Sequence, residues 1–210
     1  IIDLSEHGAQ PMHSACGRFV IVFNGEIYNH RELRAELEGA SAAPHWRGHS
    51  DTEILLAAVA HWGLHGAVTR LTGMFAFALW DRQERALSLA RDRLGEKPLY
   101  YGWAGGSFLF GSELKALRAH PDWRGEIDRG ALTLFLRYAY VPAPHSIYTG
   151  VRKLQPGTIL TLHAGIAHGA LPEPVPYWNA AEVATAGQGT PFAGSTDDAI
   201  DVLGNKLGAA

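Results

Sequence analysis

The sequence has a single cysteine, Cys16, no long hydrophobic run and no excess of positive charge. One cysteine excludes an internal disulfide framework and fits a reducing compartment, so we expect a cytoplasmic protein. No apolar stretch approaches the ~20 residues that a membrane-spanning helix needs, and no signal peptide is visible. A formal net charge of −3 gives no general electrostatic reason to bind nucleic acid or an anionic membrane. We therefore expect a globular protein without either of these partners.

The sequence also lacks an initiator methionine, because it opens with Ile1-Ile2-Asp3. Its last residues, 207–210, stop where a helical pattern is still running. We interpret the chain as a fragment that is truncated at both ends. A length of 210 residues suits one domain of ordinary size, or one domain with an appendage.

Hairpin signals dominate the middle of the chain. One predicted hairpin joins 74–80 to 86–90, and a second joins 98–102 to 108–110 across a Gly-Gly pair. Further strands are predicted at 18–23 and 158–162, with helical patterns between the strands. Hairpins with inserted helices indicate the α+β class with antiparallel sheets.

Three of the predicted helices carry specific expectations. Asn29 and Ser50 begin two of them, and each has a glutamate three residues on, which is the capping-box spacing. A third helix is predicted over 129–138, with one apolar face turned toward the core. The residues expected on that inward face are Leu132, Phe135 and Leu136.

The charged stretch Arg91-Asp92-Arg93 lies between apolar strands. It is compatible with a catalytic role or with an internal turn held by ion pairs. Because charges between strands must be paired, we predict the ion-paired turn.

The composition changes after about residue 163. Prolines alternate with alanine, glycine and threonine over 164–194, which is typical of a connector and not of a core. Ser195 is then placed to cap a helix that runs toward the end of the chain. We predict a domain over 1–163, a connector over 164–194 and the first helix of a further domain over 195–210.

The apolar run 19–23 ends abruptly in Asn24-Gly25-Glu26. A carboxamide and a glycine N–H can both donate to an oxygen that gains negative charge, and a carboxylate can hold a cation. The same residues also suit an ordinary turn after a buried strand, with Glu26 solvated, because Asn-Gly is a common turn pair. The residues alone leave both interpretations open.

Five segments, taken together and in order, resemble the glutaminase domain of glutamine-hydrolysing asparagine synthetases. That domain belongs to the class II glutamine amidotransferases, which have an N-terminal nucleophile. The resemblance runs from residue 1 to about 162, and the tail is similar to the family's connector. The five segments are 24–29, 48–53, 73–77, 91–100 and 112–117.

The resemblance implies a four-layer αββα sandwich of two antiparallel sheets. It implies that Asn24 and the Gly25 N–H form the oxyanion hole for glutamine hydrolysis. Glu26 and Asp51 would bind the glutamine α-amino group, although Asp51 also suits a helix N-terminus electrostatically. Backbone near Ile1 and Ile2 would help to hold the substrate.

The resemblance also implies an enzyme that hydrolyses glutamine to glutamate and supplies ammonia for the ATP-dependent amidation of a carboxylate, with aspartate as the expected acceptor. Its partners would be glutamine and a C-terminal synthetase domain of the same chain, and a homodimer is left open. ATP and magnesium would belong to that synthetase domain. We predict no cofactor in this fragment and no metal site, because the 11 histidines lack metal-ligand spacing.

The departures from the family pattern matter as well. The family's nucleophile is an N-terminal cysteine whose own α-amine acts as the base, and we expect it upstream of Ile1. Cys16 is followed by Gly17 but has no free α-amine, so we reject it as a substitute. Three alternatives remain open: a non-catalytic scaffold of the β-lactam synthetase type, an amidotransferase for a surface-sugar carboxylate, and a glutamine sensor.

Overall fold

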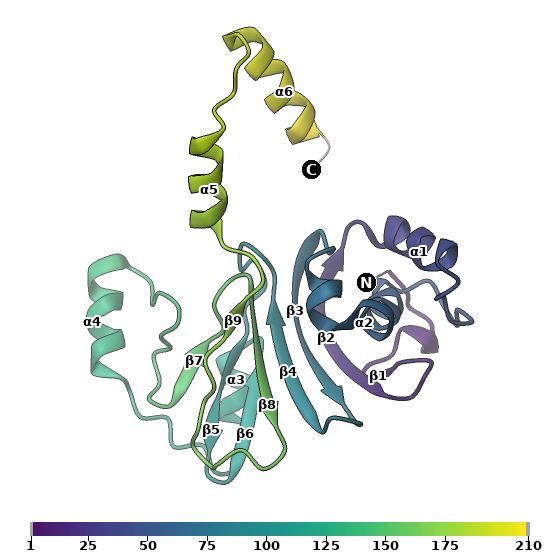
Figure 1. The fold of residues 1–210 in the computed structure, drawn as a ribbon. Coiled ribbons are helices and arrows are strands. Elements are labelled where there is room, and N and C mark those ends of the chain that lie inside the picture. Colours follow the sequence, from purple (N-terminus) through teal and green to yellow (C-terminus); the bar gives the residue numbers. More distant parts are fainter. Residues whose placement is uncertain (1, 209–210) are drawn as a thin grey trace. The chain divides into compact units, whose positions relative to one another are not determined.

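The computed structural model describes residues 2–208, and contacts between Cα atoms divide the chain into two units. The first unit ends at Trp178 and the second begins at Asn179. Figure 1 shows the elements of both units along the chain. None of the described helices is both long and apolar enough to cross a membrane.

The first unit contains two antiparallel sheets. The larger one has the strand order β1 (Met12–His13), β2 (Phe19–Ile27), β3 (Gly73–Asp81), β4 (Ala86–Arg91), β8 (Thr158–His163) and β9 (Val175–Pro176). The smaller one has the order β6 (Ser107–Gly111), β5 (Tyr100–Ala104) and β7 (Val151–Lys153). Both predicted hairpins are confirmed, since β3 pairs with β4 and β5 pairs with β6.

Helices accompany both sheets. The helices of the first unit are η1 (Glu6–Gly8), α1 (His30–Gly39), α2 (Asp51–Val68), α3 (Leu114–Arg118) and α4 (Arg129–Tyr138). Gly63 interrupts α2 with a φ of 73° and a ψ of 167°, so α2 is kinked there. In Figure 1, α1 and α2 lie on one side of the larger sheet, and the smaller sheet lies on the other.

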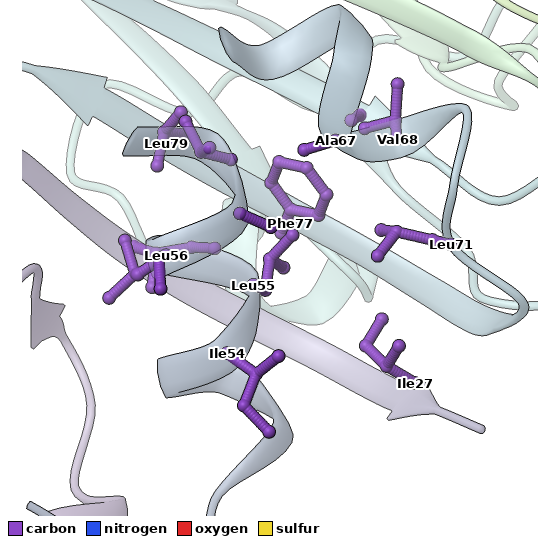
Figure 2. Packing of buried hydrophobic residues seen from close by; sticks show 14 of the residues in the cluster. Ile27, Ile54, Leu55, Leu56, Ala67, Val68, Leu71, Phe77 and Leu79 are labelled. Atoms are coloured by element: carbon purple, nitrogen blue, oxygen red, sulfur yellow. The ribbon is translucent and has the colours of Figure 1, made fainter. Parts of the chain in front are cut away.

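Two hydrophobic clusters hold these layers together. Residues of β3 alternate between them, because successive side chains of a strand point to opposite faces. Phe75, Phe77 and Leu79 face α2, and Figure 2 shows Leu55 of α2 beside Phe77. Ala76 and Ala78 face the second cluster, which includes Tyr101 of the smaller sheet and Leu99, which lies just before β5. This arrangement confirms the predicted α+β fold with two packed antiparallel sheets.

The strand β2 extends further than its sequence pattern indicated. It runs through Asn24, Gly25 and Glu26 to Ile27, and Gly25 is paired with Phe75 of β3. The interpretation of Asn24-Gly25 as a turn is therefore wrong. A Cβ atom at Gly25 would lie only 2.2 Å from the carbonyl oxygen of Met74, so glycine is needed for the close approach of the strands.

The predicted side-chain cap forms at one helix and not at the other. Among the described hydrogen bonds, the reciprocal bond of a capping box forms at neither, since Glu53 accepts from the N–H groups of Arg47 and Gly48. Ser50 caps α2, since its Oγ accepts the N–H of Thr52 at 3.1 Å. Asn29 precedes α1 but makes no side-chain cap. Its carboxamide instead accepts from the N–H of Thr72 at 2.8 Å and donates to the carbonyl of Arg70 at 2.9 Å. A long-range contact thus replaces the local one.

The apolar face of α4 does not point inward. Its exposed fractions are 39% at Leu132, 46% at Phe135 and 77% at Leu136, and only Ala131 is buried. The predicted direction is wrong because helical spacing shows which residues share a face but not what covers that face.

The predicted ion-paired turn at 91–93 is also wrong. Arg91 donates to the backbone carbonyls of Gly95, Lys97 and Leu154 at 2.5, 2.7 and 2.6 Å. Asp92 accepts from backbone N–H groups only. Backbone groups therefore satisfy both charges, where side-chain partners were expected.

The second unit consists of α5 (Ala180–Gly189) and α6 (Thr196–Gly208). Ser195 caps α6 as predicted, because its Oγ accepts the N–H of Asp198 at 3.2 Å. Asp198 in turn accepts the N–H of Ser195 at 2.9 Å, which completes a capping box. The division into a domain, a connector and a further domain stays a prediction.

Candidate functional site

A pocket of about 290 Å³ lies where β2 ends and α2 begins. Five of the six predicted site residues line it, although they come from three separate parts of the sequence. These are Ile2, Asn24, Gly25, Glu26 and Asp51. The sixth, Ile1, lies outside the described residues. The structure thus brings together the residues on which the predicted glutamine site depends.

Asp51 is the first residue of α2 and is only 6% exposed. Its Oδ2 accepts the backbone N–H of Ile27 at 2.9 Å, so this carboxylate joins the start of α2 to the end of β2. Its Oδ1 has only a 3.4 Å contact with the Thr52 hydroxyl. Oδ2 therefore holds the two elements together, and Oδ1 can still accept a hydrogen bond from a ligand.

Glu26 supplies a second carboxylate to the same pocket. It follows Gly25 on β2 and is paired with Met74 of β3, and its side chain is exposed. Two carboxylates in one pocket favour a cationic group such as an ammonium. In residues 2–208, no group of three or more metal-ligating side chains is close enough to hold a metal ion.

Asn24 and Gly25 form the strand edge of the pocket. The Nδ2 of Asn24 donates to the Oγ of Ser112 at 3.0 Å, which uses one of its two N–H groups. Gly25 has no side chain between its backbone and the pocket. The edge therefore presents a carboxamide and backbone, which are the kinds of groups that can donate to a developing oxyanion.

Asp3 is a residue of this pocket that the sequence analysis missed. It is only 4% exposed and accepts from the Ser5 hydroxyl at 2.6 Å, the Ser5 N–H at 2.9 Å and the His49 N–H at 3.2 Å. The Ser5 hydroxyl first, and then these N–H groups, lower the pKa of Asp3 from 3.8 to about 2. A Cβ atom at Gly48 would lie 2.4 Å from the carboxylate, so glycine leaves room for it. Asp3 thereby ties the N-terminal segment to the loop before α2.

The local signal for Asp3 was an aspartate two residues before a serine, a pattern typical of a side-chain turn. That pattern indicates a turn but does not show which distant loop the carboxylate reaches. Gln10 was missed for a similar reason. Its Oε1 accepts the N–H of Phe23 at 2.6 Å, beside Asn24, through a contact that no spacing predicts.

Asp92 stabilises β3, the strand that pairs with the Asn24-Gly25 segment of β2. It is 1% exposed, and its Oδ2 accepts the N–H of Phe75, the residue paired with Gly25, at 3.2 Å. The backbone N–H of Asp92 donates to the carbonyl of Phe75 at 2.8 Å. Asp92 therefore continues the ladder of β3 beyond the last residue of β4 and fixes the strand that faces Gly25.

Cys16 lies away from this edge. It lines a different pocket, together with Ala42 and Leu56, and does not line the one that contains Asn24. It also has chain neighbours on both sides and hence no free α-amine. The structure therefore gives no support to Cys16 as a nucleophile for this site.

A sequence profile described as "Glutamine amidotransferase domain" matches residues 1–178. The chain belongs to the glutamine amidotransferase domain family. Two similar relatives are the Bacillus subtilis proteins named asparagine synthetase [glutamine-hydrolyzing] 3 and 1, both 41% identical, over 171 and 163 residues. The alignments cover 77% of this chain in both cases but 26% and 25% of the relatives, so the chain spans about a quarter of their length.

The fold of this amidotransferase domain also has a solved counterpart. The glutamine phosphoribosylpyrophosphate amidotransferase from B. subtilis, complexed with ADP and GMP, superposes with a TM-score of 0.56 at 18% identity. The match covers 82% of this chain and 32% of that one. At this identity the likeness shows the fold. Together with the family match, it confirms the resemblance on which the sequence analysis relied.

Proposed function

We propose that this glutamine amidotransferase domain binds glutamine in the pocket between β2 and α2 and hydrolyses its side-chain amide. The observation that carries the proposal is the meeting of two kinds of groups in one pocket. Glu26 and Asp51 supply acceptors for an α-ammonium group, and Asn24 and Gly25 supply donors for an oxyanion. The carboxylates alone would indicate only a site for a cationic group, and the donors alone would indicate only a site for an anion.

The chemistry follows from the family's nucleophile, a cysteine at the processed N-terminus that precedes Ile1 in the resemblance. Its α-amine takes the thiol proton, and the thiolate attacks the carbon of the glutamine amide. The carbonyl oxygen becomes negative, and Asn24 Nδ2 and the Gly25 N–H stabilise it. When the tetrahedral intermediate collapses, the proton goes to the leaving nitrogen, ammonia departs and a thioester remains. Water then hydrolyses the thioester to glutamate.

The proposal extends to the reaction of the whole protein, in which the released ammonia would be used. The relatives are named glutamine-hydrolyzing asparagine synthetases, which supports aspartate as the acceptor. The ammonia would be used by a synthetase domain of the same chain, which would also bind ATP and magnesium, and a homodimer would be a compatible assembly. An amidotransferase for a surface-sugar carboxylate would share this domain and differ in the acceptor.

The experiment is a glutamate assay on the full-length protein with glutamine alone, followed by ATP, magnesium and aspartate or another acid. Glutamate formation is expected, with asparagine appearing when aspartate is supplied. A scaffold would bind ATP and aspartate without releasing glutamate, and its gene would lack cysteine after the initiator methionine. A glutamine sensor would bind glutamine in calorimetry without turning it over.

A further inference from the structure

We propose that Ser112 is the positioning residue of the oxyanion hole, because its hydroxyl holds the Asn24 carboxamide in one orientation. This inference rests on the proposed function of Asn24. Ser112 follows β6 of the smaller sheet, whereas Asn24 belongs to β2 of the larger sheet, 88 residues earlier. The hydrogen bond at 3.0 Å therefore joins the two sheets at the edge of the pocket.

Asn24 needs such a support because it has open space on two sides. It lines the 290 Å³ pocket and also a second pocket of about 150 Å³. Side chains of both sheets line the second pocket, among them Ala76 and Phe110. Without a fixed partner, the carboxamide can rotate toward this second space. A donor to an oxyanion is effective only when it is already oriented before the charge develops.

The bond to Ser112 selects one orientation. The Nδ2 of Asn24 has two N–H groups, and Ser112 accepts from one of them. The other N–H is left for the substrate oxygen. Ser112 lines the second pocket but not the pocket of the glutamine site, so it supports Asn24 without touching the substrate.

The hydroxyl of Ser112 has no competing structural task among the described hydrogen bonds. A serine just before a helix often serves as its N-cap. Here the N-cap of α3 is Glu113, which makes no side-chain cap, and among the described hydrogen bonds the Ser112 hydroxyl accepts from no N–H of α3. Gly111 packs tightly beneath α3, where a Cβ would lie 2.9 Å from Leu117 Cδ1, so the segment that carries Ser112 is well anchored.

The test is steady-state glutamine hydrolysis by the full-length protein. Ser112→Ala should lower kcat by about 3- to 10-fold, the value of one neutral hydrogen bond, with KM for glutamine unchanged. Ser112→Thr, which keeps the hydroxyl, should restore kcat. Ser107→Ala, at the other end of β6, is the matched control because the Ser107 hydroxyl makes none of the described hydrogen bonds.

A double-mutant cycle separates positioning from a general loss of structure. If Ser112 acts through Asn24, adding Ser112→Ala to Asn24→Ala should cause no further loss of kcat. Additive losses, or a rise in KM with kcat unchanged, would overturn the inference. If the wild-type protein hydrolyses glutamine and Ser112→Ala equals it, only the role of Ser112 is wrong. If the wild-type protein forms no glutamate, the proposed function and this inference both fail.

Discussion

Replacing Asp92 with asparagine is the most direct test of how the strand beside the proposed glutamine site is held in place. The Asp92 carboxylate is 1% exposed and accepts four backbone N–H groups. Its Oδ2 accepts from Phe75 and Lys97 at 3.2 and 3.0 Å, and its Oδ1 accepts from Leu94 and Glu96 at 3.2 and 2.9 Å. The substitution changes little in volume but converts one oxygen into an amino group.

The expected loss of unfolding free energy follows from these four hydrogen bonds. An asparagine can keep its oxygen toward the buried N–H of Phe75 and that of Lys97, which is the less costly orientation. Its amino group then faces the N–H groups of Leu94 and Glu96, so two donors lose their acceptor. At about 1–3 kcal/mol for each unsatisfied donor, reduced because these two are only partly buried, we expect a loss of about 2–4 kcal/mol. That is a large part of a typical stability of about 5–15 kcal/mol.

The assay is equilibrium unfolding in urea, followed by tryptophan fluorescence, for the wild type and Asp92→Asn. Asp128→Asn is the matched control. Asp128 caps α4 through one bond to the N–H of Ala131 at 3.0 Å, and asparagine caps helices equally well. We expect the control to change the unfolding free energy by less than about 0.5 kcal/mol. A loss below about 1 kcal/mol for Asp92→Asn would contradict this role of Asp92, since the four bonds would then contribute no more than a surface contact.

Three further substitutions test the pocket itself. Asn24→Ala should lower kcat for glutamine hydrolysis by about 100-fold or more while glutamine still binds, and an unchanged kcat would remove Asn24 from the oxyanion hole. Asp51→Asn should mainly raise KM, because it deletes a charge partner of the α-ammonium group; calorimetry showing unaltered glutamine affinity would contradict that role. Asp3→Asn should remove part of the acid-induced loss of stability. The folded pKa of Asp3, about 2, lies below its ordinary 3.8, so its stabilisation is complete above about pH 4 and is lost as the pH falls toward 2. Thermal unfolding from pH 5 to pH 2 should therefore show a shallower decline for the variant, and parallel curves would refute the assignment.

Local patterns predicted the elements whose stability depends on neighbours in the chain. The hairpin of β3 and β4 follows from two apolar runs with a short polar link, and Ser50 was correctly placed as the cap of α2. The same reasoning was wrong for Asn29, whose side chain bonds to Thr72 and not to its own helix. It was also wrong for the direction of Leu136, since helical spacing does not show what covers a face.

The sequence was enough to predict the family and the α+β fold, because ordered segments such as 24–29 and 48–53 carry the resemblance to that family. It also named five residues that meet in one pocket. The three-dimensional structure was needed to show how that pocket is built. It placed Asn24-Gly25 inside a strand, brought Ser112 to Asn24 across 88 residues, and buried Asp3 against the loop before α2. These contacts depend on the packing of two sheets and a helix, and packing joins residues that no local pattern relates.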